Sequence, residues 1–264
     1  MQNKKGAIMK VAILAGGLGT RLSEETTIKP KPMVEIGGKP ILWHIMNSYA
    51  VYGFKEFVIA LGYKGEIIKD YFLNYHYRAR SLTVELKSGN VTIHEGDGED
   101  WCVHLLDTGA ETQTGGRVKR VAEFIGHESF MLTYGDGVSN INIAELVNFH
   151  SKHGKLATIT AVHPPARFGQ MTFEGERVSR FMEKPQIGEG WINGGFFVLE
   201  PEIINCIDND QTIWEHEPLE QLASNGQLIA YRHEDFWHCM DTMRDVQLLN
   251  RIWAEGVAPW KTRS

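Results

Sequence analysis

The sequence has few cysteines and no long apolar run, and both absences limit what the protein is. Its 264 residues include three cysteines, Cys102, Cys206 and Cys239, an odd number without metal-ligand spacing. We therefore expect reduced thiols and a cytoplasmic protein. No apolar run approaches the roughly 18 residues of a membrane span. Residues 1–9 lack the apolar core of a signal peptide, and we expect them to form a flexible leader.

Positive charge is also scarce. The chain has 27 lysines and arginines against 33 aspartates and glutamates, and its formal net charge is −6. Because non-specific nucleic-acid binding requires a basic face, this balance argues against a nucleic-acid partner. The hydrophobic content of 42% is enough for a sizeable core. Without a linker, a repeat or a low-complexity tract, residues 10–264 are expected to form one domain.

Several common catalytic and cofactor motifs are missing. The stretch 17–22 lacks the third glycine of a dinucleotide-binding loop, and the prolines of 29–32 prevent a long helix directly after it. There is no Walker loop, no H-x-x-x-H zinc pattern among the eleven histidines and no serine in a nucleophile elbow. These absences disfavour the oxidoreductase, P-loop, zinc-protease and serine-hydrolase classes.

A glycine-rich loop is the most informative stretch that is present. The apolar run 10–15 predicts a buried parallel strand that leads into the glycines of LAGGLGTR, residues 14–21. Without Cβ atoms, the amides of such a loop can approach a ligand and point toward it together, as a triphosphate would require. A simple tight turn is the alternative. Positive charge that would suit an anion follows at Arg21, Lys29 and Lys31.

The hydrophobic patterns alternate between strand and helix along most of the chain. Besides 10–15, strands are expected at 57–61, 130–134 and 156–162, and helices at 41–52, 65–74, 116–125, 143–153 and 241–255. This order predicts an α/β, Rossmann-like fold with a mostly parallel central sheet. Segment 81–108 breaks the rhythm, and we expect its β-rich stretches 83–86, 91–94 and 103–106 to form an antiparallel insertion. Two more β-rich stretches lie at 170–173 and 194–199.

Two residues have chemical interpretations from their position alone. Lys31 stands between two prolines that fix the backbone on both sides and so hold its side chain in one direction, as a phosphate-binding lysine would require. The alternative is a solvated lysine, which is the usual case on a loop. Asp136 follows the strand 130–134, and open α/β sheets bind ligands beyond the carboxyl ends of their strands. A carboxylate there could hold magnesium with a nucleotide, whereas Asp-Gly is also a common turn.

At this point the sequence resembles a known family. The strings LAGGLGTRL and KPKPMVEIGGKPILWHIM are similar to the signature of sugar-1-phosphate nucleotidyltransferases, and the resemblance runs from about residue 9 to the C-terminus. It implies the transfer of a nucleotidyl group to a sugar 1-phosphate with release of pyrophosphate. It also implies catalytic roles for Arg21 and Lys31. The nucleotide-binding residues implied at the loop are Leu14, Ala15, Gly16, Gly17, Leu18, Gly19, Thr20, Arg21 and Lys31, with Gly135 near the metal.

The same resemblance implies two further sets of ligands. Asp136 and Asp241 would bind Mg²⁺, although Asp241 also fits the cap of the last helix. Segments 181–185 and 191–195 resemble the family's sugar-phosphate segments, with turn residues of a β-rich surface as the alternative. There the binding residues would be Glu183, Lys184, Asn193 and Gly194, and Arg167–Gly169 is placed only loosely near the sugar.

The segment 107–117 indicates which base is used. Its T-x-T-G-G-R pattern resembles the cytidylyl-transferring members of the family, whereas thymidylyl and uridylyl relatives have a proline-and-glycine segment here. A glycine-rich start of a helix is the alternative. The resemblance assigns Thr112, Gly116 and Arg117 to nucleotide binding, with CTP and glucose 1-phosphate as substrates.

Two other functions remain open. The chain could be a uridylyl- or guanylyltransferase, because the phosphate site is shared, or a nucleotide-sensing binding protein without turnover. By resemblance we also expect a homo-oligomer, as large as a hexamer, that supplies CDP-sugars for bacterial surface polysaccharides such as lipopolysaccharide O-antigen.

Overall fold

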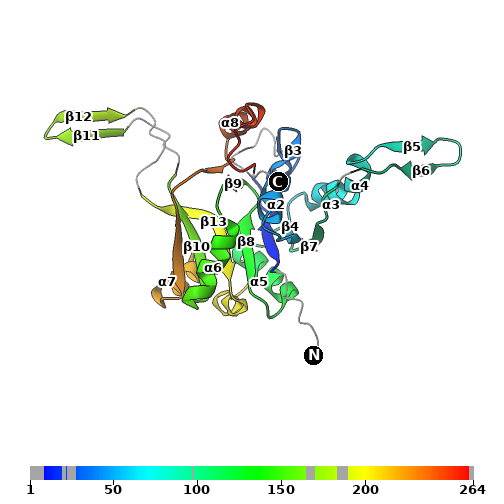
Figure 1. Ribbon diagram of the computed structural model, residues 1–264. Coiled ribbons are helices and arrows are strands. Elements are labelled where there is room, and N and C mark those ends of the chain that lie inside the picture. The colour runs from blue at the N-terminus through cyan, green and yellow to red at the C-terminus, as the bar shows by residue number, and fades with distance from the viewer. Residues whose placement is uncertain are drawn as a thin grey trace.

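A seven-stranded sheet forms the centre of the protein (Figure 1). The structure is a computed structural model that describes residues 9–19, 22, 28–96, 98–164, 170–182 and 190–261. In order across the sheet, the strands are β14 (Leu228–His233), β10 (Ala157–Val162), β13 (Ile192–Leu199), β8 (Phe130–Tyr134), β1 (Val11–Leu14), β4 (Glu56–Leu61) and β7 (Cys102–Asp107).

Most pairs in this sheet are parallel. β1 pairs in parallel with β4 and β8, β4 with β7, and β10 with β14. Within the described sheet, β13 alone runs antiparallel to its neighbours β8 and β10. The expected α/β fold with a mostly parallel sheet is therefore confirmed. Because β1 lies between β8 and β4, its carboxyl end opens beside theirs, where the glycine loop begins.

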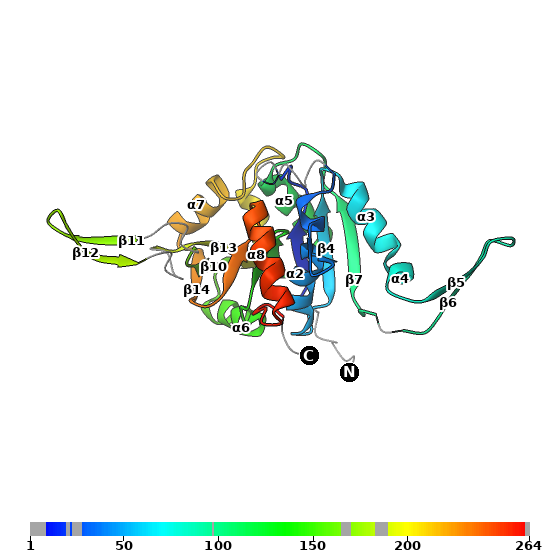
Figure 2. The ribbon, with the colours of Figure 1, turned by 90° about the horizontal axis from the view of Figure 1, so that it is seen from above.

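Helices cover both faces of the sheet (Figure 2). Along β1, Val11 and Ile13 pack into one apolar cluster and Ala12 and Leu14 into another, as the two-residue period of a strand requires. The first cluster includes α2 (Ile41–Ala50), α6 (Ile143–His153) and α8 (Met243–Ala254). The second includes α5 (Thr114–Ile125), α7 (Glu217–Ser224) and the short η3 (Pro201–Cys206).

The remaining elements are small. They are η2 (Lys31–Met33), the ladder of β2 (Glu35–Ile36) with β3 (Lys39–Pro40), α3 (Gly65–Leu73), α4 (Tyr75–Arg78), and the ladder of β9 (Gly137–Ser139) with β15 (Trp237–Cys239). Two hairpins project from the body in opposite directions in Figures 1 and 2. They are β5 (Leu82–Glu85) with β6 (Asn90–Ile93), and β11 (Gln170–Glu174) with β12 (Arg177–Met182).

The structure corrects one expectation about segment 81–108. Its first two stretches form the antiparallel hairpin β5–β6, as expected, but the third becomes β7, a parallel edge strand of the main sheet. Only β4 pairs with β7 in that sheet, and the middle of β7 is half-buried, so its sequence shows the mixed pattern of an edge strand. The direction of pairing is decided by the partner strand and not by the local residues.

Two other expectations concern the leader and the membrane. Residues 1–8 of the expected leader lie outside the described residues. None of the helices that the structure describes is long and apolar enough to cross a membrane.

Candidate active site

A cavity of about 880 Å³ opens at the carboxyl ends of β1, β4 and β8. Its wall brings together segments that are distant in sequence: the glycine loop, the region around Lys31, the turn after β8, the start of α5 and the segment before α8. The lining residues are Leu14, Ala15, Gly16, Gly17, Leu18, Gly19, Lys31, Pro32, Tyr63, Ala110, Glu111, Thr112, Gln113, Thr114, Arg117, Tyr134, Gly135, Asp136, Gln211 and Asp241.

The glycine loop is shaped by an arginine beneath it. The Arg117 guanidinium donates through Nη2 to the Gly16 carbonyl at 3.2 Å, and a Cβ built on Gly16 would lie 2.4 Å from Arg117 Nη1. A Cβ on Gly17 would have no neighbour within 4 Å, and Gly19 has a φ of +64°, a backbone conformation that favours glycine. Packing against Arg117 therefore requires glycine at position 16, and the backbone conformation favours glycine at position 19. Gly17 leaves its side of the loop open to a ligand.

Arg117 also holds the segment predicted to bind the base. Its Nη1 donates to the carbonyls of Leu61 and Gly109 and to the Thr108 hydroxyl, and its Nη2 to the Ala110 carbonyl. The side chain is buried, and its N–H groups donate to oxygens of the glycine loop, of Leu61 and of the segment 108–110. Arg117 therefore connects the phosphate loop to the segment before α5, as a support for the nucleotide pocket.

Lys31 lies between the two predicted metal ligands. Its Nζ is 2.6 Å from Asp136 Oδ2 and 2.7 Å from Asp241 Oδ1. Burial by itself would lower the pKa of this lysine, but the Asp136 charge and the hydrogen bonds to both carboxylates outweigh it, so that the pKa is raised. Lys31 is therefore fully charged at neutral pH, at the edge of the cavity.

A short ladder explains how the two aspartates meet. β9 follows Asp136 directly and β15 ends two residues before Asp241; the ladder pairs Cys239 with Gly137, and the Met240 amide donates to the Asp136 carbonyl at 2.8 Å. Asp241 does not cap α8. The Thr242 side chain accepts from the Asp245 amide, and Asp245 in turn accepts from the backbone of Thr242 in a capping box. The Asp241 carboxylate is left to face Lys31.

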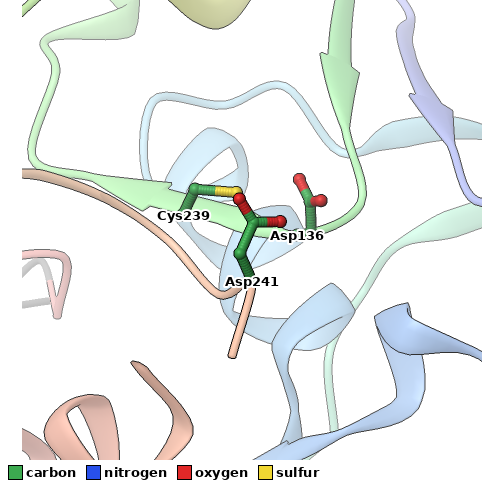
Figure 3. A group of neighbouring side chains, drawn as sticks. All are labelled: Asp136, Cys239 and Asp241. Atoms are coloured by element: carbon green, nitrogen blue, oxygen red, sulfur yellow. The ribbon is translucent and has the colours of Figure 1, made fainter. Parts of the chain in front are cut away.

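A thiol joins this group. The ligand atoms of Asp136, Cys239 and Asp241 all lie within 4.8 Å of one another, and Figure 3 shows their side chains gathered at one place. Burial raises the pKa of the Cys239 thiol, and the nearby Asp136 charge raises it further. No sequence motif marked Cys239, although its position two residues before Asp241 on an extended segment places both side chains on one side.

The predicted sugar segment lies beside the cavity and carries a polar network. Asn193 Nδ2 donates to the Tyr134 hydroxyl at 3.3 Å, and Trp237 Nε1 donates to the Gly194 carbonyl at 2.7 Å. A Cβ on Gly194 would lie 2.7 Å from Val162, so this glycine serves the packing of β13 against β10. Among the described residues, Asn193 and Gly194 are not part of the cavity lining.

Several predicted residues meet in the cavity and others do not. The lining includes Leu14, Ala15, Gly16, Gly17, Leu18, Gly19, Lys31, Thr112, Arg117, Gly135, Asp136 and Asp241. Gly116 is buried and does not line the cavity; a Cβ there would lie 2.7 Å from the Asp210 Cα. Thr20, Arg21, Arg167, Phe168, Gly169, Glu183 and Lys184 lie outside the described residues.

Other lining residues were not found from the sequence. Glu111, Gln113 and Thr114 belong to the distinctive segment 107–117, so their neighbourhood was already a signal. Gln211 is brought in from a distant loop whose backbone bonds to the start of α5: the Gln113 amide donates to the Asp210 carbonyl at 2.8 Å. No local pattern marks Gln211.

The sequence and the fold place the chain in a known class. The model of the nucleotidyl transferase family matches residues 10–242, and the chain belongs to this family. Two solved structures share the fold: HddC from Yersinia pseudotuberculosis complexed with GMP-PN (TM-score 0.69, 24% identity, 93% of this chain and 99% of that chain) and UDP-glucose pyrophosphorylase complexed with UDP-glucose (TM-score 0.67, 17% identity, 94% and 99%). At these identities the likeness concerns the fold alone.

Relatives of higher sequence identity belong to one kind of nucleotidyltransferase. The chain is 54% identical over 255 residues to the glucose-1-phosphate cytidylyltransferase of Salmonella typhi, with 96% of this chain and 99% of the relative covered. It is 46% identical over 254 residues to the probable glucose-1-phosphate cytidylyltransferase of Bacillus subtilis, with the same shares covered.

Proposed function

We propose that this protein transfers the cytidylyl group of CTP to α-D-glucose 1-phosphate, giving CDP-glucose and pyrophosphate. The observation that carries the proposal is the convergence of the glycine loop, Lys31, Asp136 and Asp241 on one cavity, in a chain whose similarity to cytidylyltransferases extends over nearly its whole length. An open amide-lined loop next to a cation and two carboxylates suits a metal-bound triphosphate.

The chemistry is a displacement at phosphorus. A phosphate oxygen of glucose 1-phosphate attacks the α-phosphorus of CTP, a new P–O bond forms, and the bond from that phosphorus to the oxygen bridging to the β-phosphate breaks. Pyrophosphate leaves with the electron pair. Because the attacking phosphate is already anionic at neutral pH, no general base is needed. The protein contributes position and charge: the loop amides and Arg21 hold the β- and γ-phosphates, and Lys31 offsets charge growing on the α-phosphoryl group.

Asp136 and Asp241 would hold Mg²⁺. The fit is indicated by Lys31 Nζ, a single cation that both carboxylates contact within 2.7 Å. When bound, Mg²⁺ would neutralise phosphate charge, using the two carboxylates and phosphate oxygens as ligands. Before it binds, the ammonium of Lys31 keeps the two carboxylates together. With a metal cation held by the two carboxylates, Lys31 would be available to face the α-phosphate. On the acceptor side, Lys184 would hold the sugar phosphate, and Glu183 and Asn193 the sugar hydroxyls.

The choice of base is assigned to the segment that ends at Arg117. Cytosine presents an amino donor and a ring-nitrogen acceptor where uracil presents a carbonyl acceptor and an N–H donor. Backbone and hydroxyl groups around Thr112 would match one pattern and oppose the other. Each buried polar group left unpaired costs about 1–3 kcal/mol, so two mismatches favour CTP by roughly 30-fold or more.

The test is initial-rate pyrophosphate release with CTP, UTP, dTTP and GTP, each with glucose 1-phosphate, and mass spectrometry of the product. We expect kcat/KM to be highest with CTP, and Arg117→Ala to raise KM for CTP more than KM for glucose 1-phosphate. Equal or greater efficiency with UTP would assign the chain to the uridylyltransferases. Calorimetric CTP binding with no pyrophosphate release would indicate a nucleotide-sensing protein.

Assembly and setting form a further proposal. The protein is a homo-oligomer, with a hexamer as the largest expected form, in the cytoplasm, and supplies CDP-sugars for surface polysaccharides such as O-antigen. In support, the two-stranded hairpins expose Val84, Leu86, Val91 and Val178, and isolated hairpins are only marginally stable in water. Light scattering after size-exclusion chromatography tests this, since a monomer at micromolar concentration would contradict it.

A further inference from the structure

The end of β15 places a cysteine beside the two aspartates in a fixed register. Successive side chains of an extended strand point to opposite sides, so Cys239 and Asp241 share a side while Met240, fully buried, points into the core. Cys239 pairs with Gly137, and this pairing places Asp136, the residue before Gly137, beside the other two side chains. The approach of the thiol to both carboxylates therefore follows from backbone pairing.

These three side chains form a mixed donor set. Two carboxylate oxygens and one sulfur lie within 4.8 Å of one another, and among the residues that the structure describes this is the group of potential ligands close enough to share one metal ion. Lys31 Nζ contacts both carboxylates, which marks the place that a cation takes between them. Magnesium prefers oxygen ligands, whereas thiolate sulfur selects softer cations such as Zn²⁺.

We propose that Cys239 is a third, sulfur ligand of the Asp136–Asp241 site, so that this site also takes a thiophilic divalent cation such as Cd²⁺ or Zn²⁺. The inference rests on the metal site of the proposed function and adds a ligand to it. On coordination the thiol releases its proton to solvent, and the thiolate sulfur binds the cation. With two carboxylates and a thiolate, the site resembles a four-coordinate zinc site that has one position left. Mg²⁺ usually keeps several waters and phosphate oxygens instead, so the thiophilic cation should inhibit nucleotide transfer.

Cd²⁺ is the probe, and the ultraviolet sulfur-to-cadmium charge-transfer band is the readout. The other thiols are removed first, because Cys102 Sγ lies 3.7 Å from His104 Nε2 and could bind cadmium separately. In the full-length Cys102→Ser/Cys206→Ser protein, one equivalent of Cd²⁺ should produce the band. Adding Cys239→Ser should abolish it and weaken calorimetric Cd²⁺ binding by at least about 10-fold more than Mg²⁺ binding, the lower end of what losing even an outer contact to a metal ligand costs.

A second variant links the thiol to the carboxylates. Asp241→Asn in the same background should weaken Cd²⁺ binding and lower the band at substoichiometric cadmium, and circular dichroism would verify that each variant is folded. A band that persists in Cys239→Ser, or a Cys239-containing protein that shows none, would overturn the inference. So would Cd²⁺ binding that is unchanged by Asp241→Asn.

The two proposals fail separately. A cadmium band that depends on Cys239 and Asp241, in a protein without nucleotide transfer, would refute the proposed function and support the sulfur ligand. Magnesium-dependent CDP-glucose formation in a protein that shows no cadmium band would support the proposed function and refute the sulfur ligand.

Discussion

The phenol of Tyr134 donates a hydrogen bond to Glu215 Oε1 over 2.6 Å, and the other oxygen of the same carboxylate accepts one from the Thr114 hydroxyl, also at 2.6 Å. Tyr134 ends β8 directly before the metal-site turn, and Thr114 begins α5 within the base segment 107–117. Glu215, which no sequence motif marked, therefore connects these two parts of the cavity wall. Asn193, at 3.3 Å from the Tyr134 hydroxyl, extends the connection to the sugar segment.

This relationship predicts a pH dependence of stability. Burial raises the pKa of Tyr134, and the Glu215 charge raises it further. An unfolded phenol ionises near pH 10, so above about pH 10 the folded state binds the proton that the unfolded state releases. The stabilisation is fully present below pH 10 and is lost as pH rises toward the folded pKa, by up to about 1.4 kcal/mol per pH unit for one group.

Urea unfolding between about pH 9 and about pH 11 measures the effect. Tyr134→Phe should make the fall in unfolding free energy with pH shallower than in the wild type. Other buried tyrosines act in both proteins and cancel in the comparison. Identical slopes would show that Tyr134 ionises equally in both states.

Lys31→Ala should lower kcat by roughly 100-fold or more, the scale of losing one preorganised electrostatic donor. The matched control is Lys29→Ala, two residues away. Lys29 Nζ lies 3.9 Å from Glu35, a distance at which an ion pair on the surface is worth little. We expect the control to retain most of its kcat. Steady-state kinetics of both variants shows which lysine has the catalytic role. A large loss of kcat in Lys29→Ala with a small loss in Lys31→Ala would assign that role to Lys29.

Asp136→Ala and Asp241→Ala should each remove most magnesium-dependent turnover, because each loses an oxygen ligand of one cation. The double variant should be little worse than either single variant, since residues that act as a unit are not additive. Asp208→Ala, at an exposed carboxylate, is the control. A magnesium titration in which a single variant behaves like the wild type would rule that residue out as a ligand.

The glycine loop allows a comparison between neighbours. Gly16→Ala places a Cβ 2.4 Å from the Arg117 guanidinium, which must then move and release buried carbonyls that each cost about 1–3 kcal/mol when left unpaired. We expect a clear loss of unfolding free energy and a higher KM for CTP. Gly17→Ala meets no atom within 4 Å and should keep its stability, whereas its CTP binding weakens if the phosphates lie against this face. Urea unfolding and CTP titration separate the two effects, and equal stability losses would contradict the support role of Arg117.

The sequence alone determined the features that depend on local pattern. Strong periodicity located the helix 143–153 and the strand 130–134 at the bounds that the structure has. Glycine spacing located the loop at 16–19, the flanking prolines marked Lys31, and the end of a strand placed Asp136 near a ligand site. The family resemblance added Asp241 to them.

Only the tertiary structure decided what depends on partners far along the chain. The parallel pairing of β7 is fixed by β4, and the role of Arg117 by the carbonyls of Gly16 and Leu61 that surround it. Cys239 enters the metal site because β15 pairs with β9 in one particular register. The physical reason is common to all three: a local sequence shows which side chains share one side of an element, but the fold determines which other element that side meets.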